Sequence, residues 1–175
     1  VLTSGHSFLE CPRWHQGQLW LSDFYTDRVL RVDEHGRVEV ITTAVEQPSG
    51  LGWLPDGRLL VVAMRQRKVW RQEANGEWVV HADLSTLADG HANDMVVDQQ
   101  GRAYVGNFGF DLMSGEQPHT ATLVRVDPDG AVHAAARGLY FPNGSMITPD
   151  GKTLIVVETM GNHISAFDIL PDGSL

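Results

Sequence analysis

The stretch HANDMVVDQQGRAYV, residues 91–105, contains the pattern that decides the fold. A polar cluster leads into an apolar run, a turn with a glycine follows, and a second apolar run completes the unit. Two apolar runs separated by a short turn are typical of a β-hairpin. Related layouts occur three more times, at residues 8–17, 48–57 and 141–151. The sequence therefore predicts a fold built from a repeated β-unit.

The turn glycines give the length of the repeat. Those that follow the first apolar run are 40, 44 and 50 residues apart, at Gly17, Gly57, Gly101 and Gly151. Repeats of about 40–50 residues with several short strands are typical of β-propeller blades. A helical solenoid would need a sustained 3.6-residue apolar periodicity, which this sequence lacks. We therefore expect an all-β propeller of four-stranded blades, with about four blades in this chain, at residues 8–46, 47–90, 91–140 and 141–175.

The fourth blade is expected to be incomplete. The sequence stops at Leu175, shortly after the turn that would lead into a fourth strand. The missing outer strand favours a truncated part of a larger ring over a nearly complete four-bladed ring. An open ring exposes strand edges and apolar blade faces, which we expect to pair with the missing blades or with another chain.

Composition narrows the classes of partner. The formal net charge of −9 argues against nucleic acid and anionic membranes. No apolar run approaches the roughly 20 residues of a membrane helix. The single cysteine, Cys11, excludes an internal disulfide and fits the cytoplasm. A small buried filler is favoured for Cys11 over a reactive thiol.

A set of polar residues stands at one position of the repeat. Four residues before the end of each first apolar run stand Glu10, Ser49, Asn93 and Asn143. In a propeller the innermost strands begin around one axis, so these side chains should converge. Carboxylate and amide oxygens suit a hard cation such as Ca²⁺. We predict Glu10, Asn93 and Asn143 as metal ligands, although asparagine is also frequent in turns.

Neighbouring polar residues leave alternatives open. Ser49 is a poor ligand that can simply line the cavity. Asp94 should point away from the axis, where a structural hydrogen bond and a catalytic role are equally compatible with the sequence. His91 and Asp111 can reach a substrate near the mouth, Asp111 from an inserted loop at residues 110–120, although both also fit a solvated surface.

Four strings relate the chain to a known family. They are FLECPRWHQGQLWLSD (8–23), PSGLGWLPDGRLLV (48–61), HANDMVVDQQGRAYVGNFGFD (91–111) and FPNGSMITPDGKTLIVVET (141–159). With these ordered motifs over essentially its whole length, the chain resembles the gluconolactonase family that includes regucalcin (senescence marker protein). The resemblance implies a six-bladed propeller with a divalent metal on its axis that hydrolyses sugar lactones.

The resemblance also implies roles for single residues. Glu10 and Asn143 match metal ligands of the family, and Asn93 matches an asparagine that touches metal or substrate. His91 stands where regucalcin-like members have a substrate-binding arginine, and Asp111 where they have a glutamate, which leaves the identity of the substrate open. The family's remaining ligand, an Asp that acts as general base, belongs to a later blade and is expected beyond Leu175.

The sequence therefore predicts metal-dependent hydrolysis of a sugar-type lactone, in which the ion polarises the carbonyl and activates water. Ca²⁺ is the first choice, and Zn²⁺, Mg²⁺ or Mn²⁺ are alternatives. This chain, without the base, is expected to have little or no activity alone. Two other functions remain open, an organophosphate triester hydrolase on the same site and a non-catalytic calcium-binding or scaffold propeller.

Overall fold

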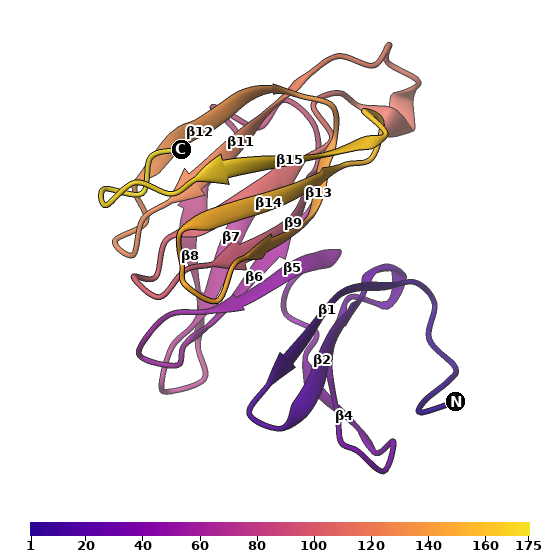
Figure 1. The fold of residues 1–175 in the computed structure, drawn as a ribbon. Helices are drawn as coiled ribbons and strands as arrows, with labels where there is room; N and C mark the ends of the chain where they lie inside the picture. The colour runs from indigo at the N-terminus through magenta and orange to yellow at the C-terminus, as the bar shows by residue number, and fades with distance from the viewer.

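The computed structural model consists of four antiparallel β-sheets, each a meander whose strands follow one another in sequence (Figure 1). It describes residues 1–175 except the side chain of Met113. The first sheet contains β1 (Leu9–His15), β2 (Gln18–Asp23), β3 (Arg28–Val32) and β4 (Val38–Thr42). The second contains β5 (Pro48–Trp53), β6 (Leu59–Ala63), β7 (Lys68–Gln72) and β8 (Trp78–Asp83). The third contains β9 (Ala92–Val97), β10 (Ala103–Asn107), β11 (Ala121–Val126) and β12 (Val132–Leu139).

The fourth sheet has three strands, β13 (Pro142–Ile147), β14 (Thr153–Glu158) and β15 (His163–Asp168). Two single-turn 3₁₀ helices, η1 (Phe24–Thr26) and η2 (Leu112–Ser114), lie in loops. Neither helix of the described part has the length and apolarity needed to cross a membrane. The first strands of successive sheets lie beside one another, β1 next to β5, β5 next to β9, and β9 next to β13. The predicted β-propeller architecture is confirmed.

The hydrophobic core lies between neighbouring sheets. In β6, Leu60 and Val62 pack toward the third sheet, whereas Leu59 and Val61 pack toward the first. Tyr104 of β10 faces the fourth sheet. The middle strands are therefore buried on both faces, which explains why their sequences are continuous apolar runs rather than alternating ones.

Each first strand contains one extra residue relative to its partner strand. The pairing register shifts between Glu10 and Arg13, between Pro48 and Leu51, between Ala92 and Met95, and between Pro142 and Ser145. An extra residue in one strand of an antiparallel pair is a β-bulge, which locally redirects side chains. The bulges occur at the same place in all four sheets, near the residues predicted to form a site.

Close packing of β5 on β9 depends on Gly50. A Cβ atom at this position would lie 2.8 Å from the backbone N of Met95 and 2.9 Å from the carbonyl O of Asn93. Gly144 occupies the equivalent position in β13, and a Cβ atom there would lie 4.0 Å from its nearest neighbour, Oδ2 of Asp94. Only the second of these glycines leaves room for a side chain.

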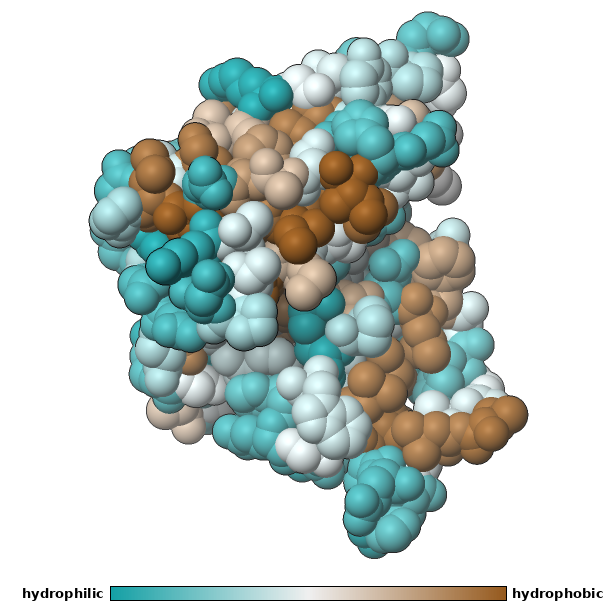
Figure 2. Space-filling view, viewed as in Figure 1, coloured by the Kyte–Doolittle hydropathy of each residue, from teal (hydrophilic) through white to brown (hydrophobic). Residues whose placement is uncertain are grey.

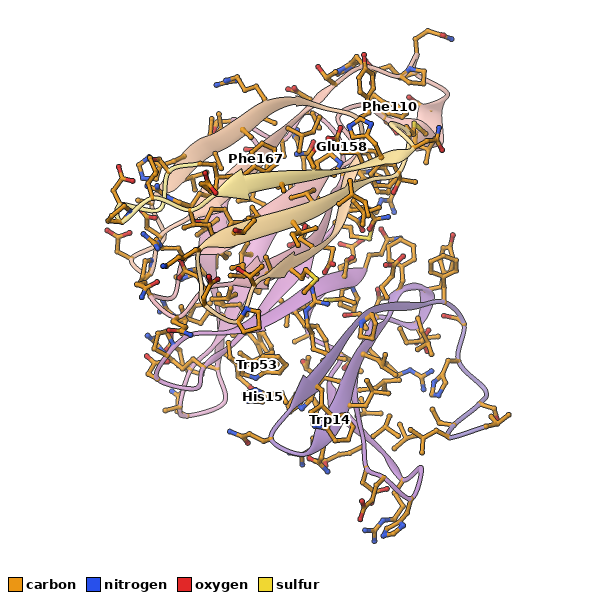
Figure 3. The ribbon with its side chains drawn as sticks, viewed as in Figure 1. Trp14, His15, Trp53, Phe110, Glu158 and Phe167 are labelled. Carbon is orange, nitrogen blue, oxygen red and sulfur yellow. The ribbon has the colours of Figure 1, made fainter. Side chains whose placement is uncertain are left out.

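The outer face of the fourth sheet is apolar and exposed. Met146, Val157 and Ile164 are 53%, 42% and 66% exposed. Figure 2 shows apolar side chains in brown on the side toward the viewer, where β14 and β15 lie in Figure 1. In contrast, the first sheet is closed against the second, where the His15 ring stacks on Trp53 with centroids 3.8 Å apart (Figure 3).

Candidate functional site

A cavity of about 530 Å³ opens where the four first strands begin. Figure 2 shows the surface indented on the right, between the N-terminal sheet and the others. The cavity is lined by all of the residues that the sequence predicted for a site, namely Glu10, His91, Asn93, Asp111 and Asn143. The structure therefore brings together side chains from the first, third and fourth sheets.

Asn93 lies at the centre of a chain of side-chain hydrogen bonds across three sheets. The Ser49 hydroxyl donates to Oδ1 of Asn93 at 3.1 Å, and Nδ2 of Asn93 donates to Oδ1 of Asn143 at 2.8 Å. Nδ2 of Asn143 then donates to Oγ1 of Thr159 at 3.0 Å. Ser49 itself is fully buried and does not line the cavity, so it supports Asn93 from behind.

The β-bulges place these residues at equivalent positions of their strands. Ser49, Asn93 and Asn143 are each the residue directly after the last regular pair before the bulge. In the first sheet that place belongs to Cys11, because Glu10 is still paired with Ser22. The expected register of Glu10 with the two asparagines is therefore wrong by one residue. Glu10 nevertheless lines the cavity.

The Glu10 carboxyl group is half-buried in this cavity. Burial raises its pKa above the ordinary value, and the nearby Asp94 carboxylate raises it further. Among the described residues, no hydrogen bond or ion pair reaches the Glu10 carboxylate. A buried carboxylate without a partner is energetically costly. A cation in the cavity would relieve that cost.

The donor set fits a hard divalent cation. In the part of the chain that the structure describes, no group of three or more His, Cys, Asp or Glu side chains is placed to hold a metal ion. The oxygens on offer are one carboxylate and two amide carbonyls. The oxygen and nitrogen of an asparagine amide have nearly the same shape and are told apart by their hydrogen bonds. The Asn93 amide therefore occupies the same space after a rotation of 180°. Its oxygen would then lie next to Oδ1 of Asn143, and the Ser49 hydroxyl would accept instead of donating.

Asp94 points away from the cavity into a partly buried ion pair. Its Oδ1 lies 2.7 Å from a guanidinium nitrogen of Arg13, which also donates to the Met95 carbonyl at 2.6 Å. The backbone N–H of Ser145 donates to Oδ2 at 3.3 Å. Of the two roles that the sequence left open, this geometry supports the structural one. Cys11 lies beside this pair, is 4% exposed, and has its pKa raised well above normal, first by burial and then by Asp94.

His91 and Asp111 lie at the rim. Burial lowers the pKa of His91, an effect that Asp111 opposes and Arg65 reinforces, so the imidazole is neutral at pH 7. Asp111 is exposed at the start of the inserted loop, and its Oδ1 accepts the backbone N–H of Ser114 at 3.1 Å. A neutral imidazole and a carboxylate can both bind hydroxyl groups.

Five aromatic residues form the walls, and the sequence interpretation did not identify them. Two sets of rings lie close together: Phe24 and Tyr25 at 4.6 Å between centroids, and Phe108 and Phe141 at 4.3 Å. Phe8 is the fifth. Four of them stand directly before a first strand or directly after a second strand, and Tyr25 stands one residue farther along. These aromatic residues could therefore have been predicted from their position in the repeat.

Carboxylates at the ends of two second strands hold these walls in place. Asp23 accepts the backbone N–H groups of Ser7 and Phe8, both at 3.0 Å, and an ion pair from Arg28 at 2.6 Å. Burial alone would raise the pKa of Asp23, but hydrogen bonds from the Ser7 hydroxyl, the Phe8 N–H and Arg28 lower it far below normal. Glu158 does the same in the fourth sheet, where it accepts the Tyr140 N–H at 2.7 Å (Figure 3).

Comparison with known proteins adds independent support. A family model described as "SMP-30/Gluconolactonase/LRE-like region" matches residues 8–175. Pentonolactonase XacC of Haloferax volcanii is 26% identical over 154 residues, which cover 86% of this chain and 49% of that protein. The chain thus spans about half the length of this curated relative.

Solved structures give the same picture. The gluconolactonase XC5397 of Xanthomonas campestris superposes with a TM-score of 0.80 at 28% identity, covering 99% of this chain and 62% of that one. A calcium-binding protein described as regucalcin, from Agrobacterium tumefaciens, superposes with a TM-score of 0.77 at 21% identity, covering 98% and 57%. At that lower identity the likeness concerns the fold.

Proposed function

The chain belongs to the SMP-30/gluconolactonase/LRE-like family, and from this membership we propose that it supplies the metal-binding and substrate-binding part of a site that hydrolyses sugar-type lactones. The observation that supports the proposal most is the meeting of Glu10, His91, Asn93, Asp111 and Asn143 in one cavity. These residues come from three sheets, and an ordinary structural role does not require polar side chains to converge there.

In this proposal Glu10, Asn93 and Asn143 hold the divalent cation, with Ca²⁺ as the first choice because every donor is a hard oxygen. When bound, the ion polarises the lactone carbonyl and lowers the pKa of water. Glu10 supplies the negative charge, and Asn143 together with the turned amide of Asn93 supplies two neutral oxygens. Ser49 keeps the Asn93 amide oriented.

His91 and Asp111 orient the substrate. The neutral His91 ring accepts or donates a hydrogen bond to a sugar hydroxyl, and Asp111 accepts one. The aromatic walls pack against the carbon-bound hydrogens of the lactone ring and reduce access of bulk water. The relatives are longer than this chain, and we propose that the base for the attacking water comes from residues outside 1–175.

The test is hydrolysis of five- and six-membered sugar lactones by the full-length polypeptide after removal of metal and after addition of Ca²⁺, Zn²⁺, Mg²⁺ or Mn²⁺. We expect activity to disappear with chelation and to return with a divalent ion. Asn143→Ala should abolish it, whereas Asn75→Ala, which removes an exposed amide bonded only to Glu77, should not.

Two outcomes would overturn the proposal. The first is full lactone hydrolysis without metal or in the Asn143→Ala variant. The second is no lactone hydrolysis with any of the four ions. Faster turnover of a phosphotriester than of every lactone would assign the site to phosphoester hydrolysis instead.

A further inference from the structure

Arg65 is the one arginine without a partner in the described structure. The chain has eleven arginines, and the guanidinium groups of the other ten donate to a carboxylate, a carbonyl or a hydroxyl group of the protein. Acidic residues outnumber basic ones by 22 to 13, so partners are in excess. Even Arg37, with a side chain 82% exposed, pairs with Asp33 at 2.6 Å. Simple exposure therefore does not account for the isolation of Arg65.

The turn that carries Arg65 is fixed beside the candidate site. The Met64 carbonyl accepts the N–H of Ala92 at 3.1 Å, and the Met64 N–H donates to the Gln47 carbonyl at 3.1 Å. The N–H of Arg67 closes the turn on the Met64 carbonyl at 3.2 Å. These bonds anchor the turn to the start of β9, which carries Asn93. Arg65 accordingly lines the same cavity.

The charges around the cavity suit an anionic ligand group. Two carboxylates, those of Glu10 and Asp111, line the cavity, and Arg65 contributes a guanidinium group to the same lining. Glu10 is assigned to the metal under the proposed function. Arg65 and His91 line the same cavity, and an imidazole N–H can donate a hydrogen bond to an anion beside the guanidinium. A guanidinium presents a fork of N–H donors that matches a carboxylate or a phosphate with two parallel bonds.

We propose that Arg65, with His91 beside it, binds an anionic substituent of the substrate, so that the site prefers lactones bearing a carboxylate or a phosphate over neutral sugar lactones. The inference rests on the proposed function, because it names the substrate class of the same cavity. Arg65 acts by direct contact with the substituent, away from the lactone carbonyl. Its loss should therefore affect binding more than the chemical step.

The kinetic test compares wild type, Arg65→Gln and Arg65→Lys on a neutral sugar lactone, a carboxylate-bearing lactone and a phosphate-bearing lactone. For the preferred acidic lactone we expect Arg65→Gln to raise KM about 10-fold and to leave kcat nearly unchanged. An effect of this size corresponds to the loss of one hydrogen bond to a charged group at an exposed site. KM for the neutral lactone should stay the same, and Arg65→Lys should recover part of the loss. Lys152→Gln, which removes an exposed cation at the hairpin beyond β13, is the matched control and should behave as wild type.

A direct binding measurement separates this inference from the proposed function. An open-chain sugar diacid and inorganic phosphate are titrated calorimetrically into wild type and Arg65→Gln, each with Ca²⁺ present. Weaker anion binding by Arg65→Gln than by wild type supports the inference even if no lactone is hydrolysed. Whether the diacid or the phosphate binds shows which of the two substituents the site prefers. Hydrolysis of neutral and acidic lactones with equal KM in both variants, or identical anion affinities, would overturn it and leave the proposed function standing.

Discussion

Nδ2 of Asn93 donates a hydrogen bond to Oδ1 of Asn143 at 2.8 Å, although 50 residues separate the two in sequence. The bond joins the first strands of the third and fourth sheets at equivalent bulge positions. Two amides that already touch can share a ligand with little rearrangement, which reduces the entropic cost of assembling a site.

Ser49→Ala should weaken metal binding although Ser49 does not line the cavity. Its hydroxyl orients the Asn93 amide, and loss of such a supporting bond typically costs about 10-fold or more in metal affinity. Calcium titration calorimetry measures the change. Ser165→Ala, at a serine bonded to Glu158, is the control and should leave affinity unchanged. Equal affinity in wild type and Ser49→Ala would contradict the proposed support.

Glu10→Gln should stabilise the metal-free protein at pH 7 while removing its metal affinity. Because the folded-state pKa of Glu10 is raised, its ionisation opposes folding as pH rises above the ordinary value of 4.5. In wild type, protons compete with the cation, so metal affinity should fall as pH is lowered through the raised pKa. Thermal melts and calcium titrations across pH 4–8 test both signs. A Glu10→Gln variant that binds Ca²⁺ normally would refute the assignment.

Gly50→Ala should lower the free energy of unfolding by about 1–3 kcal/mol, because its Cβ would collide with the backbone of β9. Gly144→Ala is the matched control at the equivalent position of β13, where the atom nearest to the added Cβ is 4.0 Å away. We expect it to be near neutral. Urea unfolding of both variants provides the measurement, and equal destabilisation would show that the packing of β5 on β9 is not the cause.

Asp23→Asn should reduce stability at pH 7 by on the order of 2 kcal/mol, since the carboxylate accepts charged and backbone hydrogen bonds in a buried place. The folded-state pKa is lowered, so this contribution is present above the ordinary pKa of 3.8 and is lost as pH falls below it. The variant should therefore lose less stability than wild type between pH 4 and pH 2. Glu34→Gln, at a carboxylate whose side chain is 79% exposed, is the control.

Ile164→Ser together with Met146→Ser should reduce association of the chain. Both side chains lie on the exposed face of the last sheet, and contiguous apolar surface promotes contacts between molecules. Sedimentation velocity at several concentrations measures the effect. Val40→Ser, on β4 of the first sheet, is the control, and an unchanged concentration dependence in the double variant would contradict the prediction.

The repeat explains how much of the fold and site could be predicted. Glycine turns bounded by apolar runs report hairpins locally, and equivalent places in successive blades converge, so the meeting of Asn93 and Asn143 could be predicted from the sequence. The bulge of β1 has no such local signature, and the register of Glu10 was therefore one residue off. The ion pair of Asp94 with Arg13 spans 81 residues and depends on packing between sheets. Arg65 belongs to no sequence motif. Its proposed role follows from a comparison with the other ten arginines, whose guanidinium groups all have partners in the structure.

The bulges have a consequence for how such a protein can evolve. At the bulge position of the four first strands stand Cys11, Ser49, Asn93 and Asn143, a thiol, a hydroxyl and two amides. A residue at a bulge is left out of the regular strand pairing, so no cross-strand partner fixes its side chain. Selection can therefore exchange the chemistry of one position at a time while the ring keeps its geometry. The same scaffold can in this way change its ligand without passing through an unfolded ancestor.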